Sequence, residues 1–305
     1  MKTIKKIALI HLAFAMGFGH ALAADNNEFN NKVNECNQLV KNDKAQNALD
    51  LSLQLIKQNK SSRDAQACKG RAELSLEQNQ QAIETFKVVS QLSSTAMDKM
   101  MSQALLGNAY KANKQADEAL ASYKAALEIA KTMRNQGLER VSHELIASAL
   151  FLGKKYDEAI PEYQLASKLA QNDRERAESY ERLAECYEKL AKLDLAIEYQ
   201  VKASLAHTKY SDLDTQANVQ LELGRMYTEA NLFDQAKSTI DKVLALAQGG
   251  SDYWEAKSYI YLAKLMHAMH NNKEATDLLV KADRLNQKLG DETLKELILV
   301  TDLSK

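Results

Sequence analysis

Four glutamates stand close together in the middle of the chain, at a spacing that could bind a cationic partner. They are Glu178, Glu181, Glu185 and Glu188, and we call them the acidic ladder. Spacings of three, four and three residues put them on one face of a helix, where like charges repel by roughly 0.2–0.5 kcal/mol per pair. Arg182 and Lys189 follow two of the glutamates by four residues and offset part of this repulsion. The acidic ladder is either a solvated helix surface or a contact for a basic segment of a partner.

Two histidines have the spacing that would suit a metal ion. His267 and His270 are three residues apart, and Met266 and Met269 beside them would offer soft sulfur to copper. Met266, however, falls at a core position of the repeat described below, and His270 falls where a helix should end, before Asn271. The sequence therefore predicts no metal site.

Motifs that would indicate catalysis are missing from the sequence. It contains no phosphate-binding GxxxxGK[ST] loop, no HExxH zinc helix and no GxSxG nucleophile elbow. Its glycines suit helix crossings and turns, as at Gly249 and Gly250. We predict a protein that is not an enzyme and needs no cofactor.

The elements that position these residues are predicted to be helices. One proline, ten glycines and 45% apolar residues leave little material for tight hairpins. The abundant Ala, Leu, Glu, Lys and Gln are good helix formers. The composition therefore predicts an all-α protein.

The first 23 residues have the pattern of a secretory signal peptide. Three lysines precede an apolar run over residues 7–18, and Ala21 and Ala23 stand at the −3 and −1 positions of a cleavage site before Ala24. The run is shorter than the ~20 residues of a membrane-spanning helix, and no cysteine follows for lipid attachment. We predict cleavage of residues 1–23, a periplasmic or secreted location, and no membrane span.

The charge of the mature chain argues against nucleic acid as a ligand. Removing residues 1–23 takes three lysines and no acid from 40 basic and 41 acidic residues, which leaves a formal charge of −4. A nucleic-acid binder needs a cationic face that displaces the counterions of the phosphates. We expect a protein or peptide partner instead.

An alanine recurs along the chain at a nearly constant interval. The copies are Ala48, Ala82, Ala119, Ala159, Ala196, Ala236 and Ala275, with spacings of 34, 37, 40, 37, 40 and 39 residues. Twelve residues before each of these anchors stands a second small residue: Cys36, Gly70, Gly107, Ala147, Ala184, Gly224 and Ala263. The pattern predicts about seven helix-turn-helix repeats.

The physical reason for this pattern is close helix packing. Two helices approach each other closely only where the residues at the crossing are small, so we expect the small residue of each first helix to face the anchor alanine of the second. Large residues such as Tyr123, four after the anchor, would fill the space beside the crossing. The fifth copy departs from the pattern, with Gln200 at this large position.

The repeats resemble those of the tetratricopeptide repeat family. The matching residues are Leu-Gly-x-x-Tyr at Leu106, Gly107 and Tyr110, and again at Leu223, Gly224 and Tyr227, each followed at the family spacing by its alanine. The period of 37–40 residues is longer than usual, and the closing proline is missing. The resemblance implies a right-handed superhelical α-solenoid over residues 24–290, with residues 291–305 as a C-terminal capping helix.

The resemblance also implies where a ligand would bind. Family members contact ligands with the first helices on the concave side, at positions two, five, nine, twelve and thirteen when the small residue is position eight. These positions hold the acidic ladder and also Arg71, Asn108, Lys111, Asn218, Arg225, Lys257 and Lys264. The family's carboxylate clamp needs Lys at five and Asn at nine, but Asn108 is accompanied by Ala104. We therefore expect no chaperone C-terminal tail as the ligand.

Two of the three cysteines could form a disulfide. Cys36 and Cys68 lie on successive predicted first helices, which should pack side by side, and an exported chain meets an oxidising environment. The bond would leave Cys186 as a free thiol. The alternative is that Cys36 and Cys68 are both small core residues.

The function predicted from these observations is a non-catalytic scaffold or adaptor of the periplasm or cell envelope. It would bind a peptide or protein on the concave face, with the acidic ladder holding a basic segment and Arg225 and Lys264 meeting an acidic part. Two alternatives stay open, a cytoplasmic peptide-sensing regulator with similar repeats and a periplasmic metal-handling protein. The mature N-terminus would distinguish the first alternative, and metal analysis the second.

Overall fold

A computed structural model describes residues 24–207 and 212–301, and all of its regular structure is helical. The predicted signal peptide lies outside these residues. The helices are α1 (Ala24–Lys41), α2 (Ala45–Gln58), α3 (Arg63–Ser75), α4 (Asn79–Leu92), α5 (Ala96–Ala112), α6 (Ala116–Thr132), α7 (Gln136–Leu152), α8 (Tyr156–Leu169), α9 (Asp173–Lys189), α10 (Leu193–His207), α11 (Leu213–Glu229), α12 (Phe233–Ala247), α13 (Asp252–Ala268), α14 (Asn272–Leu289) and α15 (Glu292–Val300). The prediction of an all-α solenoid is confirmed.

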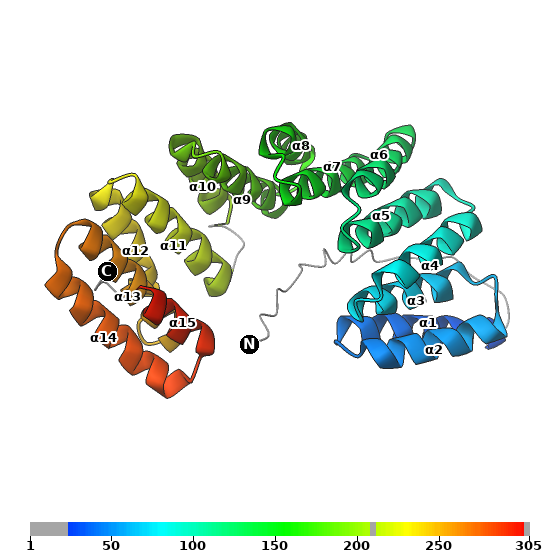
Figure 1. Ribbon diagram of the computed structural model, residues 1–305, viewed down its shortest axis with the longest axis horizontal. Helices are drawn as coiled ribbons and strands as arrows, with labels where there is room; N and C mark the ends of the chain where they lie inside the picture. The colour runs from blue at the N-terminus through cyan, green and yellow to red at the C-terminus, as the bar shows by residue number, and fades with distance from the viewer. Residues whose placement is uncertain (1–23, 208–211, 302–305) are drawn as a thin grey trace.

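The helices pack as seven consecutive pairs, which we number repeats 1 to 7, followed by α15. Each helix contacts the next along the chain, and α1 also contacts α3 while α11 contacts α13. The pairs follow one another along an arch with α1–α4 at one end and α11–α15 at the other (Figure 1). At the second end α15 packs on α13 and α14. None of the described helices is both long and apolar enough to cross a membrane.

The crossings are built on the predicted small residues and anchors, and at three of them a large side chain also takes part. All seven anchor alanines are fully buried. In repeat 1 the small residue meets its anchor as predicted, since Sγ of Cys36 lies 3.3 Å from the carbonyl oxygen of Ala48. In repeats 2, 3 and 6 the small residue is a glycine, and the large side chain four residues after the anchor lies closest to it. An ideal Cβ on Gly70, Gly107 or Gly224 would lie 2.6, 2.4 or 2.5 Å from Phe86, Tyr123 or Ile240. These glycines therefore make room for a large side chain of the second helix.

Each repeat turns between its two helices through one residue in the left-handed region. These residues are Asp43, Glu77, Lys114, Lys154, Ala191, Asn231 and His270, with φ between 54° and 62°. Each stands seven residues after the small residue of its repeat. The next residue donates its N–H to a carbonyl five residues back, as Lys192 does to Tyr187 at 2.9 Å. This bond satisfies a free carbonyl at the end of the first helix.

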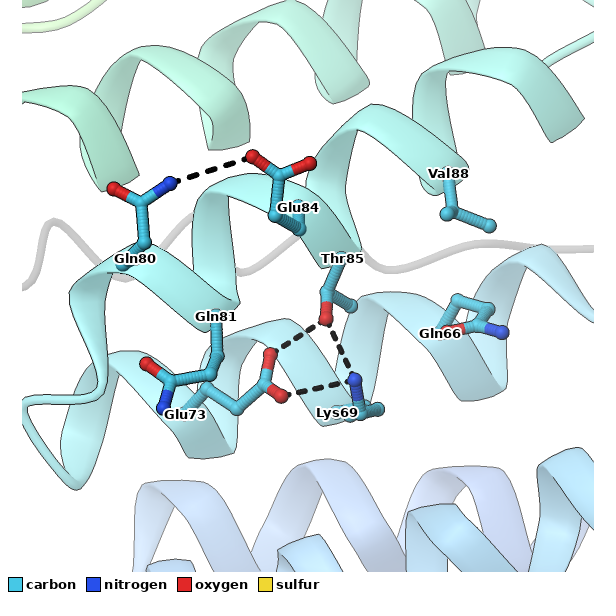
Figure 2. Close-up of a pocket in the computed structure, with 8 residues that line it drawn as sticks. All are labelled: Gln66, Lys69, Glu73, Gln80, Gln81, Glu84, Thr85 and Val88. Atoms are coloured by element: carbon cyan, nitrogen blue, oxygen red, sulfur yellow. Dashed lines mark hydrogen bonds and ion pairs between the residues drawn. The ribbon is translucent and has the colours of Figure 1, made fainter.

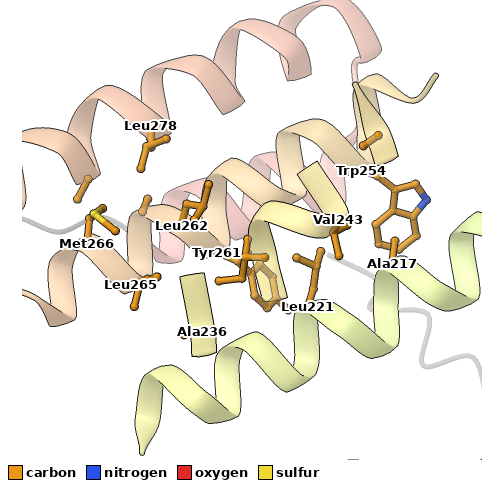
Figure 3. Close-up of a cluster of buried hydrophobic side chains, with 14 residues drawn as sticks. Ala217, Leu221, Ala236, Val243, Trp254, Tyr261, Leu262, Leu265, Met266 and Leu278 are labelled. Carbon is orange, nitrogen blue, oxygen red and sulfur yellow. The ribbon is translucent and has the colours of Figure 1, made fainter. Parts of the chain in front are cut away.

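Buried side chains fill the space between repeats as well as within them. One cluster joins helices α11 to α14 and includes Leu221, Leu262, Met266 and Trp254 (Figure 3). The indole N–H of Trp254 is hydrogen-bonded to Asp214. The departure at Gln200 also has a packing reason, because its buried side-chain amide donates to the Val219 carbonyl of α11 at 3.1 Å.

A disulfide joins Cys36 on α1 to Cys68 on α3, with Cα atoms 6.2 Å apart. Both residues are fully buried. The bond therefore crosslinks the first helices of repeats 1 and 2. Cys186 is a buried free thiol, and burial raises its pKa to about 12.

Candidate binding surface on the first helices

The first helices of the repeats face the inside of the arch. Figure 1 shows α5, α7, α9 and α11 on the inner side and α6, α8, α10 and α12 on the outer side. We call the surface formed by first-helix positions two, five, nine, twelve and thirteen the inner face. All the binding residues predicted from the sequence belong to it.

The acidic ladder lies on α9, but three of its four carboxylates have partners. Glu181 lies 2.6 Å from Nε2 of His207, and Glu185 lies 2.8 Å from Arg182. Glu188 lies 3.0 Å from Arg225 of the next repeat. Of the four, only Glu178 is exposed and makes no ion pair with a described residue. The acidic ladder therefore contributes mainly to packing between helices, and Glu178 is the member that faces solvent.

Arg225 connects three carboxylates and so has little capacity left for a ligand. Its guanidinium lies 2.8 Å from Glu222, 2.7 Å from Glu229 and 3.0 Å from Glu188. Burial opposes the charged form, but these bonds outweigh it and raise the pKa of Arg225. The expectation that Arg225 meets an acidic part of a partner does not fit this geometry, because all its strong bonds are made within the protein.

The two inner-face cations of repeats 2 and 3, Arg71 and Lys111, are different, because neither has a carboxylate partner among the described residues. Arg71 donates to the side-chain oxygen of Asn37 at 2.9 Å, and burial lowers its pKa. Lys111 makes no ion pair in the described chain, and burial alone lowers its pKa. Asn108, one turn before Lys111, accepts a hydrogen bond from Tyr123 at 2.7 Å. Repeats 2 and 3 therefore each place one partly buried cation on the inner face.

The first helix of repeat 4 adds a mainly apolar surface. Leu152 is 63% exposed at the end of α7. Val141 and Phe151 are half-buried on the same helix, as is the small Ser148 between them. All four occupy inner-face positions. Leu152 in particular packs little against the rest of the described chain, so its exposure costs hydrophobic free energy that a ligand could recover.

A largely buried carboxylate lies between this apolar surface and α9. Glu144 of α7 pairs with Arg140, which also lies 3.2 Å from Glu175 of α9. Burial is the main reason that the pKa of Glu144 rises to about 7, and the charges of Glu178 and Glu175 add to the effect. The repeat spacing alone would place Glu144 on the inner face, at position five of repeat 4. The spacing does not predict that this carboxylate is largely buried.

The lysines of repeat 7 rest on aromatic rings. Nζ of Lys257 lies 4.8 Å from the centre of the Trp254 ring and 3.2 Å from the side-chain oxygen of Asn218. Nζ of Lys264 lies 5.4 Å from the centre of the Tyr261 ring. Burial lowers the pKa of both lysines. Rings hold these cations in place on the inner face.

The two candidate histidines do not share a helix face. His267 lies in the last turn of α13 and its Nδ1 is 2.9 Å from the side-chain oxygen of Asn272. His270 lies beyond the end of α13, in the left-handed turn position. In the described part of the chain, no three His, Cys, Asp or Glu side chains are grouped so that they could hold a metal ion.

Repeat 2 has a depression between α3 and α4 that the sequence did not indicate. Its volume is about 430 Å³, and it is lined by Gln66, Lys69, Glu73, Gln80, Gln81, Glu84, Thr85 and Val88 (Figure 2). At its floor the buried Glu73 accepts a hydrogen bond from Thr85 at 2.7 Å and pairs with Lys69 at 2.9 Å. These bonds satisfy the carboxylate, so the depression is a polar contact between α3 and α4.

Comparisons with known proteins agree with the repeat pattern. A family model described as tetratricopeptide repeat matches residues 102–133 and 177–204. No curated protein matches the sequence. Among solved structures, the chain is similar to a signal transduction ATPase with a tetratricopeptide repeat sensor from Pyrococcus horikoshii, with a TM-score of 0.71 and 17% identity over 91% of this chain and 45% of that one.

Two further structures are similar over most of their own length. BtubC from P. vanneervenii gives a TM-score of 0.57 and 19% identity over 70% of this chain and 90% of that one. Pseudomonas aeruginosa pilF gives 0.51 and 22% over 77% of this chain and 95% of that one. At these identities the likeness concerns the fold.

Proposed function

Because the chain carries tetratricopeptide repeats stacked in an α-solenoid, we propose that it is a non-catalytic adaptor that binds a peptide or protein segment on its inner face. The observation that carries this proposal is the set of partly buried cations without carboxylate partners in the described chain, above all Arg71 and Lys111. Burying a charge without a counter-charge is costly, and a ligand that supplies the partner would offset this cost.

We further propose that the adaptor acts after export, in the periplasm or outside the cell. The support is the signal-peptide pattern of residues 1–23 together with the Cys36–Cys68 disulfide, since disulfides persist in oxidising compartments. Ala24 as the mature N-terminal residue in an envelope fraction is the expected result. An uncut chain in the cytoplasm would favour the peptide-sensing regulator instead.

Site-specific photo-crosslinking tests the binding surface. A photoreactive apolar residue in place of Leu152, which is exposed on the inner helix α7, should capture a protein from an envelope extract. The same residue at Lys124, which is exposed on the outer helix α6, is the matched control and should capture little. Equal capture from both positions, or capture from Lys124 alone, would place the binding surface elsewhere.

A further inference from the structure

The inner face changes in character along the middle of the array. Repeats 2 and 3 present Arg71 and Lys111, repeat 4 presents the apolar side chains around Leu152, and the start of repeat 5 presents Glu178 beside Glu144. From repeat 3 to repeat 5 this order follows three successive first helices, α5, α7 and α9, which lie on the inner side of the arch (Figure 1).

From this order we propose that the inner face binds an extended peptide segment that is acidic at one end, apolar in the middle and basic at the other end. The acidic end lies on repeats 2 and 3, and the basic end lies on repeat 5. This inference rests on the proposed function and adds the chemistry and the orientation of the ligand.

The cationic end is selective for carboxylates because nothing in the described chain neutralises it. Asp64, the acid whose charge reaches Arg71, is already paired with Arg63, as is Asp98 of α5. Lys111 has lost part of its hydration without gaining a counter-ion. A carboxylate of the ligand would therefore offset an existing desolvation cost, which strengthens the interaction relative to an exposed ion pair.

The acidic end is selective for a cation for the opposite reason. Glu178 is exposed and makes no ion pair within residues 24–207 and 212–301, and its charge adds to those that disfavour ionisation of Glu144. Arg140 is shared between Glu144 and Glu175, and Arg182 pairs with Glu185, so neither arginine forms an ion pair with Glu178. A lysine or arginine of the ligand beside Glu178 would relieve this repulsion.

Synthetic peptides of one composition and different order test the inference. The ordered probe is a fluorescent nine-residue peptide with two aspartates, a Gly-Leu-Phe-Leu-Gly centre and two lysines. Its scrambled partner has the same residues with the charges alternating. Two further probes neutralise one end each, with Asn for Asp or with Gln for Lys. Titration followed by fluorescence anisotropy at low salt should show the ordered probe binding about three- to tenfold more tightly than the scrambled one.

Charge reversals should act on one end only. Lys111→Glu should weaken the ordered probe about three- to tenfold and leave the Asn probe unchanged, while Glu178→Lys should weaken the ordered probe and leave the Gln probe unchanged. Lys124→Glu on α6 and Asp277→Lys on α14 are matched controls, because both side chains are exposed on outer helices. Lys111→Gln removes the charge without reversing it and is a milder variant of the same position. Melting temperatures equal to that of the wild type would show that the variants are folded.

The outcomes separate this inference from the proposed function. Equal affinity for ordered and scrambled probes, or the same loss for every probe with both reversals, would overturn the charge order. Absence of binding by the ordered probe at millimolar concentration would also overturn it. The proposed function would then still be judged by the photo-crosslinking at Leu152, which does not depend on the charge order of the ligand.

Discussion

At the scale of single residues, the positions that matter most are those where the environment opposes the side chain. Glu144 is a carboxylate that burial keeps half protonated near neutral pH, and Gly107 is a position where no side chain fits. Neither property is visible in the residue type alone. Each leads to a measurable consequence for stability.

Gly107→Ala should destabilise the protein by roughly 1–3 kcal/mol. The added Cβ would lie 2.4 Å from the Tyr123 ring, which is itself fully buried and has nowhere to move. Thermal melting followed by circular dichroism measures the effect. Gly250→Ala is the control, because its Cβ would meet no atom closer than 3.9 Å. Equal melting temperatures for the two variants would show that the crossing is looser than described.

Glu144→Gln should raise stability at pH 8 and change it little at pH 5. The pKa of Glu144 is about 7 in the folded protein against an ordinary value of 4.5. The folded state therefore binds the proton more tightly than the unfolded state, and stability falls as the pH rises from about 4.5 to about 7. The amide avoids this loss, and the difference at pH 8 should be about 1–3 kcal/mol.

Denaturant unfolding at both pH values tests this expectation. Glu128→Gln is the control, since Glu128 is an exposed carboxylate on α6, with 71% of its side chain accessible. Its effect on stability should be small at both pH values, because the side chain is exposed. A Glu144→Gln variant that is less stable than the wild type at both pH values would mean that the Arg140 ion pair outweighs the cost of burying the carboxylate.

At the scale of helices and turns, the left-handed residue in each repeat is a strained position that the chain fills seven times without glycine. The Cβ of an L-residue in this conformation costs roughly 1–2 kcal/mol. Ala191 is the simplest case, because its side chain makes no compensating polar contact. The residue types give little hint of the left-handed conformation, since asparagine stands there only once and glycine never.

Ala191→Gly should therefore stabilise the protein by roughly 0.5–1 kcal/mol, after the larger entropy of glycine in the unfolded chain is subtracted. Lys189→Gly, at the exposed last residue of α9, should instead destabilise it, by up to about 1 kcal/mol. Chemical denaturation of both variants gives the comparison. Destabilisation by both would indicate that residue 191 is not held in the left-handed region in solution.

The disulfide between α1 and α3 should protect one end of the array. Closing a loop over a sequence separation of 32 residues stabilises a fold by roughly 3–4 kcal/mol in the chain-entropy model. In a linear stack of repeats, this stabilisation is confined mainly to the repeats that the disulfide joins. Reduction, or a Cys36→Ser/Cys68→Ser double variant, should lower amide protection in α1 to α3 and leave α12 to α14 nearly unchanged by hydrogen exchange.

Thiol counting gives an independent check on the same bond. The unreduced protein should show one reactive thiol after unfolding, from Cys186, and none while folded, because that thiol is buried. Three thiols in the unreduced, unfolded protein would mean that Cys36 and Cys68 are only core residues.

At the scale of the whole molecule, the sequence predicts the architecture well because each repeat depends on local spacing. The seven anchors and the small residues twelve positions earlier define the helix pairs, and all seven anchors are buried. Which side chains lie closest to each other at a crossing could not be predicted from the spacing, as the close approach of Gly107 to Tyr123 shows. The acidic ladder illustrates the main limit. The spacing of its glutamates can be seen in the sequence. The partners of Glu181 and Glu188, however, come from α10 and α11, and these contacts depend on how the helices and repeats stack.

The crosslink between the first two repeats also makes the array mechanically asymmetric. If a bound partner pulled on the two ends of the chain, the residues between Cys36 and Cys68 would bear no load, because the covalent bond would carry the force past them. Stretching in optical tweezers should therefore end about 100 Å short of the length reached after adding a reductant. The segment between the two cysteines is therefore the one part of the described chain that such a force cannot extend while the bond is intact.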